Sequence, residues 1–361
     1  MSILRISDHV AKKQKITVEI KVAGFLFGLI AVAISINFVD KQIEVYNYIP
    51  GILVYVVLSL ENNLNYKFLL RVITIFISIQ IFLGFLQYFF PKAFDSIFSF
   101  YLHGDNAASN YHRKIGRLTS YWLEAPRYAT VLASLFPFLF YKYFKKRKFM
   151  YITLIVLSAS LLFLTFTRVA LFSTIIVFVI VIIYFSPKIK LKSVLFVLFG
   201  AVVGYLLLNF YLEYVPFETF QRIIDPVKFQ NELLDKYDNY NRIFILIQLF
   251  PLTLKFPVLG SGRLYIDYLL FNFSSVHNSI LQFILMFGYL SFILFGYLIF
   301  RNLKPTVLNF FKTHSFVLAS TLAYCSILFI GLFHGVLLDG PINLFFWFLL
   351  SLTTNNYETN S

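Results

Sequence analysis

The chain has 361 residues, of which 59% are hydrophobic and only 13% are charged. A soluble globular domain carries roughly 25% charged residues, so this composition excludes an ordinary soluble domain and predicts an integral membrane protein. The net charge of +14 would fit a nucleic-acid partner only if the basic residues were not explained by membrane topology.

Apolar stretches long enough to cross a bilayer recur along the chain. About 20 apolar residues form a helix that spans the hydrocarbon core, where the backbone must satisfy its own hydrogen bonds. We therefore predict an all-α polytopic membrane protein, a single integral membrane domain over residues 1–361 with about ten transmembrane helices. The predicted spans are 22–39, 45–60, 67–90, 126–144, 149–166, 169–186, 193–212, 277–299, 315–332 and 341–353.

Basic residues gather on alternate connections, the pattern that sets the orientation of a membrane protein. With both termini in the cytoplasm, 18 of the 31 basic residues but only four of the 17 acidic residues fall on the cytoplasmic side. That side holds the whole net charge of +14, so the charge is a topology signal and no nucleic-acid partner is expected. Seven of the eleven arginines lie on the outer side. Because arginine is favoured where phosphate or carboxylate is bound, the outer face is the expected working face.

Two predicted outer loops are long, residues 91–125 and residues 213–276. The second contains an apolar stretch near residues 242–259 that Pro251 and Lys255 interrupt, which predicts an interfacial or re-entrant helix and not a further span. In the first loop, aromatic residues such as Trp122 are candidates for stacking on an acceptor sugar.

Basic side chains stand at four predicted helix starts on the outer side: Arg127, Arg168, Arg242 and His277. Helix N-termini bind anions and arginines do the same, so this arrangement predicts a phosphate site. Any one of these arginines could instead reach lipid headgroups or pair with a carboxylate such as Glu124. Arg168 is hardest to explain in that way because it lies between two apolar runs with almost no loop around it.

His277 begins a predicted span, where the helix dipole disfavours the protonated imidazole. A neutral imidazole can act as a general base or as a hydrogen-bond acceptor. The sequence has no nucleotide-binding or metal-ligand motif, so we expect no cofactor and no metal. A lipid-linked diphosphate leaving group fits these limits because it arrives activated and arginines can neutralise it.

Three groups of short segments follow one another over about residues 115–300: Arg117–Ser120 with Glu124–Ala129, then Thr165–Ala170, then Asn241 and Arg242 with Gly260–Gly262, His277, Asn278 and Gly288. In their order and spacing, these segments resemble the O-antigen polymerase and ligase superfamily, and the O-antigen polymerase family in particular.

The resemblance implies a GT-C-like glycosyltransferase in the bacterial cytoplasmic (inner) membrane, with its active site on the periplasmic side. Its donor and acceptor would be undecaprenyl-diphosphate-linked glycans, and the reaction would be metal-independent and inverting. Arg168 and Arg242 would hold the diphosphate, and His277 would activate or orient the attacking hydroxyl. Further binding residues would be Arg117, Glu124, Arg127, Arg263 and Asn278, and a chain-length regulator protein is a further expected partner.

Three functions remain open at this point. A polymerase is favoured because the chain is short and rich in Phe, Ile and Tyr, as many polymerases of the family are. A ligase, which transfers glycan to lipid A–core, is the first alternative. A flippase or transporter of the same lipid-linked sugar is the second, and it is disfavoured because charges gather at the span ends, with only Arg71 placed well inside a span.

Overall fold

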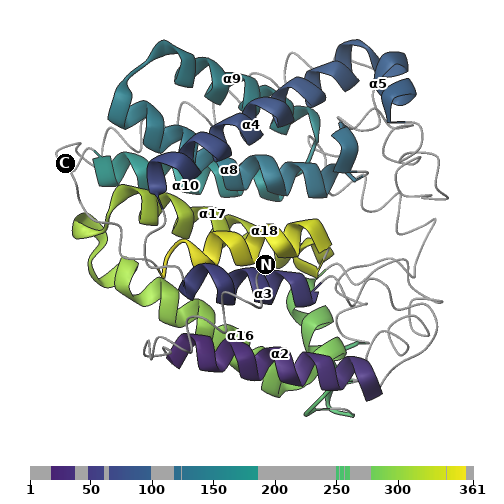
Figure 1. Cartoon of the computed structure of the whole chain (residues 1–361). Helices are drawn as coiled ribbons and strands as arrows, with labels where there is room; N and C mark the ends of the chain where they lie inside the picture. The colour runs from purple at the N-terminus through teal and green to yellow at the C-terminus, as the bar shows by residue number, and fades with distance from the viewer. Residues whose placement is uncertain are drawn as a thin grey trace. The chain divides into compact units, whose positions relative to one another are not determined.

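The regular elements of the described chain are all helical (Figure 1). The chain divides into two compact units, one formed by Val72–Asp238 and the other by Met1–Arg71 together with Asn239–Ser361. The computed structural model describes residues 18–36, 48–60, 65–98, 118–122, 124–185, 249–251, 253–255, 257–260, 278–338 and 340–354.

Three described helices are long and apolar enough to cross a membrane: α4 (Tyr66–Phe89), α10 (Arg168–Phe185) and α16 (Ser279–Leu308). Four shorter helices are also apolar: α3 (Tyr48–Leu60), α9 (Phe149–Leu164), α17 (Ser315–Gly331) and α18 (Gly340–Ser351). The other described helices are α2 (Val18–Ile36), α5 (Pro91–Ile97) and α8 (Ala125–Lys146), with 3-10 helices η2 (Ser120–Trp122), η5 (Phe310–Lys312) and η6 (Gly335–Leu338). These helices define a multi-pass membrane protein.

Nine of the predicted spans overlap a described helix, while residues 193–212 lie outside the described residues, so the count of ten stays a prediction. The largest difference is at the end of α16, which continues past Arg301 to Leu308. Hydropathy detects only the apolar part of a helix, and so it predicted an end at residue 299. The helical hydrogen bonds of α16 continue beyond that part into a polar segment. The first predicted long loop also contains a helix, α5, which begins at Pro91. Proline suits the first turn of a helix, because the N–H group that it lacks would have no partner there.

α8 is the central helix of the unit Val72–Asp238. It packs against both α9 and α10, and almost all of its side chains from Ala125 to Lys142 are buried. A helix that is buried on every face lies in the core of its unit. Its polar residues are satisfied locally: the Thr130 hydroxyl donates to Pro126 O at 2.7 Å, and the Ser134 hydroxyl donates to Val131 O at 2.8 Å.

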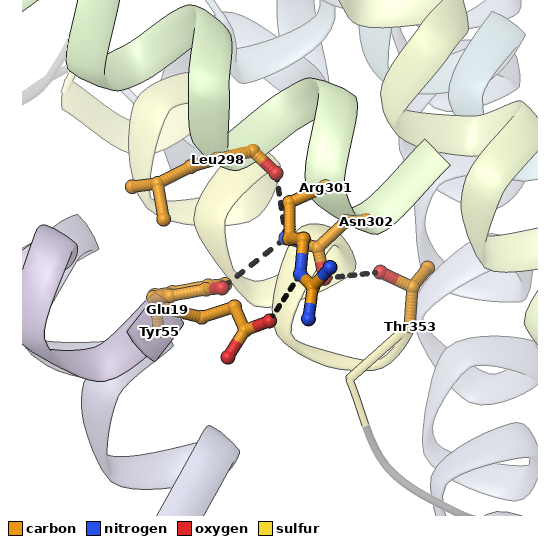
Figure 2. A network of polar contacts seen from close by, with 6 residues as sticks. All are labelled: Glu19, Tyr55, Leu298, Arg301, Asn302 and Thr353. Carbon is orange, nitrogen blue, oxygen red and sulfur yellow. Dashed lines mark hydrogen bonds and ion pairs between the residues drawn. The ribbon is translucent and has the colours of Figure 1, made fainter. Parts of the chain in front are cut away.

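The other unit joins the two ends of the chain. α2 packs along α16, and α3 packs along α18 (Figure 1). Figure 2 shows the polar network at one end of these helices. Arg301 Nε donates to Glu19 Oε1 at 2.7 Å. Asn302 Nδ2 donates to the Tyr55 hydroxyl at 3.2 Å and to Leu298 O at 2.7 Å, while Thr353 Oγ1 donates to Asn302 Oδ1 at 3.3 Å.

The buried side-chain amide of Asn302 should contribute more to the stability of the fold than the ion pair of Arg301 with Glu19 beside it. Asn302 is 6% exposed and Tyr55 is fully buried, so an Asn302→Leu variant would remove one of the two side-chain hydrogen bonds of the Tyr55 hydroxyl, at a cost of about 0.5–1.5 kcal/mol. The Arg301 side chain is 53% exposed, and exposed ion pairs contribute little. Thermal unfolding in detergent should show a clear fall in Tm for Asn302→Leu and little change for Arg301→Ala. Equal Tm values for the two variants would contradict this ranking.

In the unit formed by Met1–Arg71 and Asn239–Ser361, contacts join segments that the sequence predicts on the same side of the membrane, while the sidedness itself stays a prediction. Glu19 and Arg301, both predicted to be cytoplasmic, form the ion pair described above. The rings of Tyr66 and His314, also predicted to be cytoplasmic, lie 5.2 Å apart. At the predicted outer end, Asn278 Nδ2 donates to Leu332 O at 2.9 Å.

Candidate active site

The segment before α8 is fixed to α4 by the carboxamide of Gln87. Gln87 Oε1 accepts hydrogen bonds from the backbone N–H groups of Thr119 (3.1 Å) and Ser120 (2.7 Å). Gln87 Nε2 donates to Thr119 Oγ1 at 3.0 Å. Gln87 is 8% exposed, and Thr119 and Ser120 are fully buried, so water does not compete for these bonds. The glutamine therefore fixes the backbone that leads into α8.

A second glutamine of α4, Gln80, holds the same segment about two helical turns away. Trp122 Nε1 donates to Gln80 Oε1 at 2.9 Å, and the Tyr128 hydroxyl donates to the Gln80 carbonyl oxygen at 2.8 Å. Trp122 is buried by these contacts. The expectation that its ring belongs to an exposed sugar-stacking surface is therefore wrong: its indole N–H needs a buried acceptor, and Gln80 provides one.

Ser120 lies between the two glutamine contacts in an unusual conformation. Its φ is +49°, a left-handed backbone that a residue other than glycine rarely adopts. Its hydroxyl is buried and has no hydrogen-bond partner among the described residues. Strained residues of this kind persist only where surrounding contacts hold them, as the Gln87 carboxamide does here, and they concentrate at functional sites.

Glu124 and Arg127 occupy the first turn of α8. Glu124 is the N-cap residue, with an extended backbone, and Pro126 follows within the first turn. Arg127 Nη2 lies 3.3 Å from Glu124 Oε1, and both side chains are about 30% exposed. The carboxylate therefore already neutralises part of the charge on Arg127, and an anion bound at this helix start would compete with it.

Arg168 is the first residue of α10 and is exposed. The turn from α9 is tight: Phe166 has a φ of +52°, and the Thr167 N–H donates to Thr165 Oγ1 at 3.3 Å. The Leu118 N–H donates to Leu164 O at 3.2 Å, which joins this turn to the segment before α8. The turn thus places an arginine at a helix N-terminus beside the segment that Gln87 holds.

The helix starts that carry Arg127 and Arg168 lie at the same end of their unit. α8, α9 and α10 follow one another through short turns, so α8 and α10 run in the same direction, and they pack directly against each other. Backbone N–H groups at helix N-termini and guanidinium groups both bind anions. The phosphate site predicted at this end of the unit stays a prediction.

In the other unit, Asn278 is the N-cap residue of α16. Its Oδ1 accepts from the Leu281 N–H at 2.9 Å, and its Nδ2 donates to Leu332 O. The next residue, Ser279, donates to His334 O at 2.9 Å and accepts from the Leu337 N–H at 3.1 Å. Asn278 thus fixes the start of α16 to the connection after α17, and its predicted role in substrate binding stays a prediction.

Four predicted site residues, Arg117, Arg242, Arg263 and His277, lie outside the described residues. The residues that the sequence did not single out are Gln80 and Gln87. The two glutamines could have been found, because they lie seven residues apart in an apolar span and so share one helix face. Ser120 belongs to the segment Arg117–Ser120 of the resemblance, but nothing in the sequence marks its left-handed backbone. Among the described residues, no group of three His, Cys, Asp or Glu side chains could hold a metal ion.

Residues 153–296 match the family model described as O-antigen ligase. The match covers less than half of the chain, and it includes Arg168, Arg242, Arg263, His277 and Asn278. It supports a place in the O-antigen ligase and polymerase superfamily, hence an enzyme that transfers glycosyl groups in the synthesis of surface polysaccharide. No curated protein matches the chain.

Proposed function

We propose that this chain is a membrane glycosyltransferase that polymerises undecaprenyl-diphosphate-linked oligosaccharide repeat units into O-antigen or a related surface polysaccharide. Its place would be the bacterial inner membrane, with both termini in the cytoplasm and the active site on the periplasmic face. The bilayer, the lipid-linked donor and the lipid-linked acceptor would be its partners, and a chain-length regulator protein could act with it.

The observation that carries this proposal is the family match over residues 153–296, together with the position of Arg168 inside it. Arg168 starts a long apolar helix that packs against α8, whose own first turn carries Arg127. Two helix starts with arginines would form an anion-binding site at one end of a membrane unit, which suits a diphosphate joined to a lipid.

The proposed reaction is a single displacement at the anomeric carbon of the donor sugar. The acceptor hydroxyl oxygen forms a bond to that carbon, and the bond from the carbon to the diphosphate oxygen breaks. His277 takes the proton of the hydroxyl, while Arg168 and Arg242 stabilise the charge that develops on the departing diphosphate. Attack from the face opposite to the leaving group inverts the anomeric configuration.

Ligase activity is the second candidate, because the matching family model is described as O-antigen ligase. The two enzymes share the donor and differ in the acceptor, which is another lipid-linked glycan for a polymerase and lipid A–core for a ligase. A flippase is a weaker candidate, since it would move the lipid-linked glycan without breaking the bond to diphosphate.

Deletion of the gene, followed by gel analysis of the host's polysaccharide, separates the candidates. We expect lipid A–core capped with single repeat units, the result for a lost polymerase. Uncapped core with accumulated polymer would instead indicate a ligase. The purified protein in detergent should also join repeat units without a membrane, which a flippase cannot do. Loss of this activity in EDTA with recovery in magnesium would overturn the metal-independent mechanism.

A further inference from the structure

α16 is interrupted by a glycine whose backbone no other residue adopts easily. Gly288 has φ +79° and ψ 171°, so the helix breaks there into two parts, the first of which begins at Ser279. This region of backbone conformation is accessible to almost no residue except glycine. The N–H group of Tyr289, the first residue after the break, donates to Pro257 O at 2.7 Å. The turn at residues 257–260 thus supplies an acceptor at the break.

The backbone of the turn contacts the backbone of α16 at the break, and each of the two contains a glycine: Gly260 in the turn and Gly288 in the helix. A Cβ atom at Gly288 would overlap the carbonyl group of Val258. A Cβ atom at Gly260, where φ is +72°, would lie 2.5 Å from Met286 C and 2.6 Å from Met286 O. Real Cβ contacts are never this short, and backbone atoms cannot swing aside as side chains do. Each glycine is therefore required both by its own conformation and by the approach of the other segment.

Side chains extend this contact beyond the turn. Thr253 Oγ1 donates to Phe250 O at 2.6 Å and lies 2.7 Å from the Tyr289 hydroxyl. A hydroxyl has only one hydrogen to donate, so Tyr289 is the donor in the second bond. Leu249 and Thr253 are buried, whereas Phe250 and Leu254 are exposed, so one side of the segment rests on protein.

The contact lies well along α16 from its start. Gly288 is nine residues after Ser279, which corresponds to about 14 Å of helix, or half of the ~30 Å hydrocarbon core. Irregular backbone is tolerated at such a depth only where it is buried in protein or faces water. With the predicted span 277–299 placed across the bilayer, a segment that meets α16 there would enter the membrane, which distinguishes a re-entrant segment from a helix lying on the surface.

We propose that the segment described by residues 249–251, 253–255 and 257–260 is re-entrant and locked to α16 by Gly260 and Gly288, and that this lock positions the second long loop for glycosyl transfer. In the sequence, residues 261–277 connect the lock to Asn278, the cap of α16. The stretch includes Arg263 and His277, and Arg242 precedes Leu249 by seven residues. Gly260 and Gly288 are positioning residues, and their effect on activity rests on the proposed function.

Alanine variants at three glycines test the lock. Gly288→Ala and Gly260→Ala should force the segment away from α16. Gly296→Ala, on the same helix as Gly288, is the matched control, because a Cβ atom at Gly296 meets nothing within 4 Å. Hydrogen–deuterium exchange followed by mass spectrometry reports the lock directly. We expect faster exchange in peptides covering residues 249–260 and 286–292 for the first two variants, and wild-type exchange for Gly296→Ala.

Activity of the same purified variants reports the positioning role. A displacement of about 1 Å at reacting groups can lower a rate on the order of 100-fold, so we expect kcat to fall steeply for both lock variants while KM changes little. Gly296→Ala should keep its kcat. Tyr289→Phe removes only the hydroxyl that donates to Thr253, and it should lower kcat by a smaller factor. If the glycine variants fail to fold, this variant tests whether the lock affects activity.

Each outcome decides between distinct conclusions. Wild-type exchange and wild-type kcat in Gly288→Ala and Gly260→Ala, or in Tyr289→Phe if those do not fold, would overturn the lock. Faster exchange with unchanged kcat would overturn the positioning role alone. If the wild-type protein transfers no glycosyl group, the proposed function fails, and the exchange data still decide whether the segment is locked to α16.

Discussion

Replacing Arg168 by alanine is expected to lower the rate of chain extension by roughly 100-fold or more, the loss typical when a group that stabilises transition-state charge is removed. Arg168 is exposed at the first residue of α10, and alanine is a good helix former. The fold should therefore survive, and membrane insertion and Tm should stay near the wild-type values. The measurement is the rate of polymer formation by purified protein on lipid-linked repeat units.

Two further variants show whether the guanidinium group itself matters. Arg168→Lys keeps the positive charge but loses the planar fork that binds two phosphate oxygens, so we expect an intermediate rate. Arg127→Ala should have a smaller effect than Arg168→Ala, because Glu124 already shares the Arg127 charge. Wild-type rates in Arg168→Ala would remove Arg168 from the proposed site, whatever the other variants do.

The second large effect is expected for His277→Ala, which should abolish detectable chain extension. General-base catalysis contributes about 10²–10⁴-fold, and alanine offers no group that can accept the proton. The start of α16 should remain intact, because Asn278 and not His277 caps the helix. The rate of polymer formation and the Tm of the purified variant, measured together, separate lost catalysis from lost folding.

His334→Ala is the matched control for this variant. His334 contacts Ser279 at the start of α16 through its backbone carbonyl, which the substitution retains. We expect a polymerisation rate near that of the wild type. Wild-type activity in purified His277→Ala would refute the general-base role, and equal losses in the two histidine variants would point to a structural effect at this end of α16.

The positions of the described helices could be predicted from hydropathy, because each apolar run must bury its backbone polar groups in a helix. Of the arginines predicted on the outer side, the structure describes Arg127 and Arg168, both in the first turn of a helix, and their place on the outer side stays a prediction. The alternation of sides, inferred from the basic residues, stays a prediction, although the ion pair of Glu19 with Arg301 joins two segments that are both predicted to be cytoplasmic.

Features that depend on a distant partner were not predictable. A glycine inside a helix, such as Gly288, signals only a mild loss of helix propensity until Val258 is found against it. The sequence gives Trp122 as a candidate for stacking on an acceptor sugar, because its buried acceptor, Gln80, is 42 residues away in sequence. Asn278 could have been recognised as a helix cap from its place before an apolar run, a pattern of the kind that asparagine favours.

The pairing of α2 with α16 sets an order for assembly of the protein at the ribosome. Glu19 and Arg301 are 282 residues apart, so at ~5–20 residues per second the first helix waits roughly 15–60 s for its partner. α3 waits longer for α18, the last described helix. During that interval the inward faces of α2 and α3 must rest in lipid or on an insertion factor. Chains that end before α16 would leave α2 without α16 and α3 without α18, although α2 and α3 contact each other, and membrane quality-control proteases should recognise such truncated products.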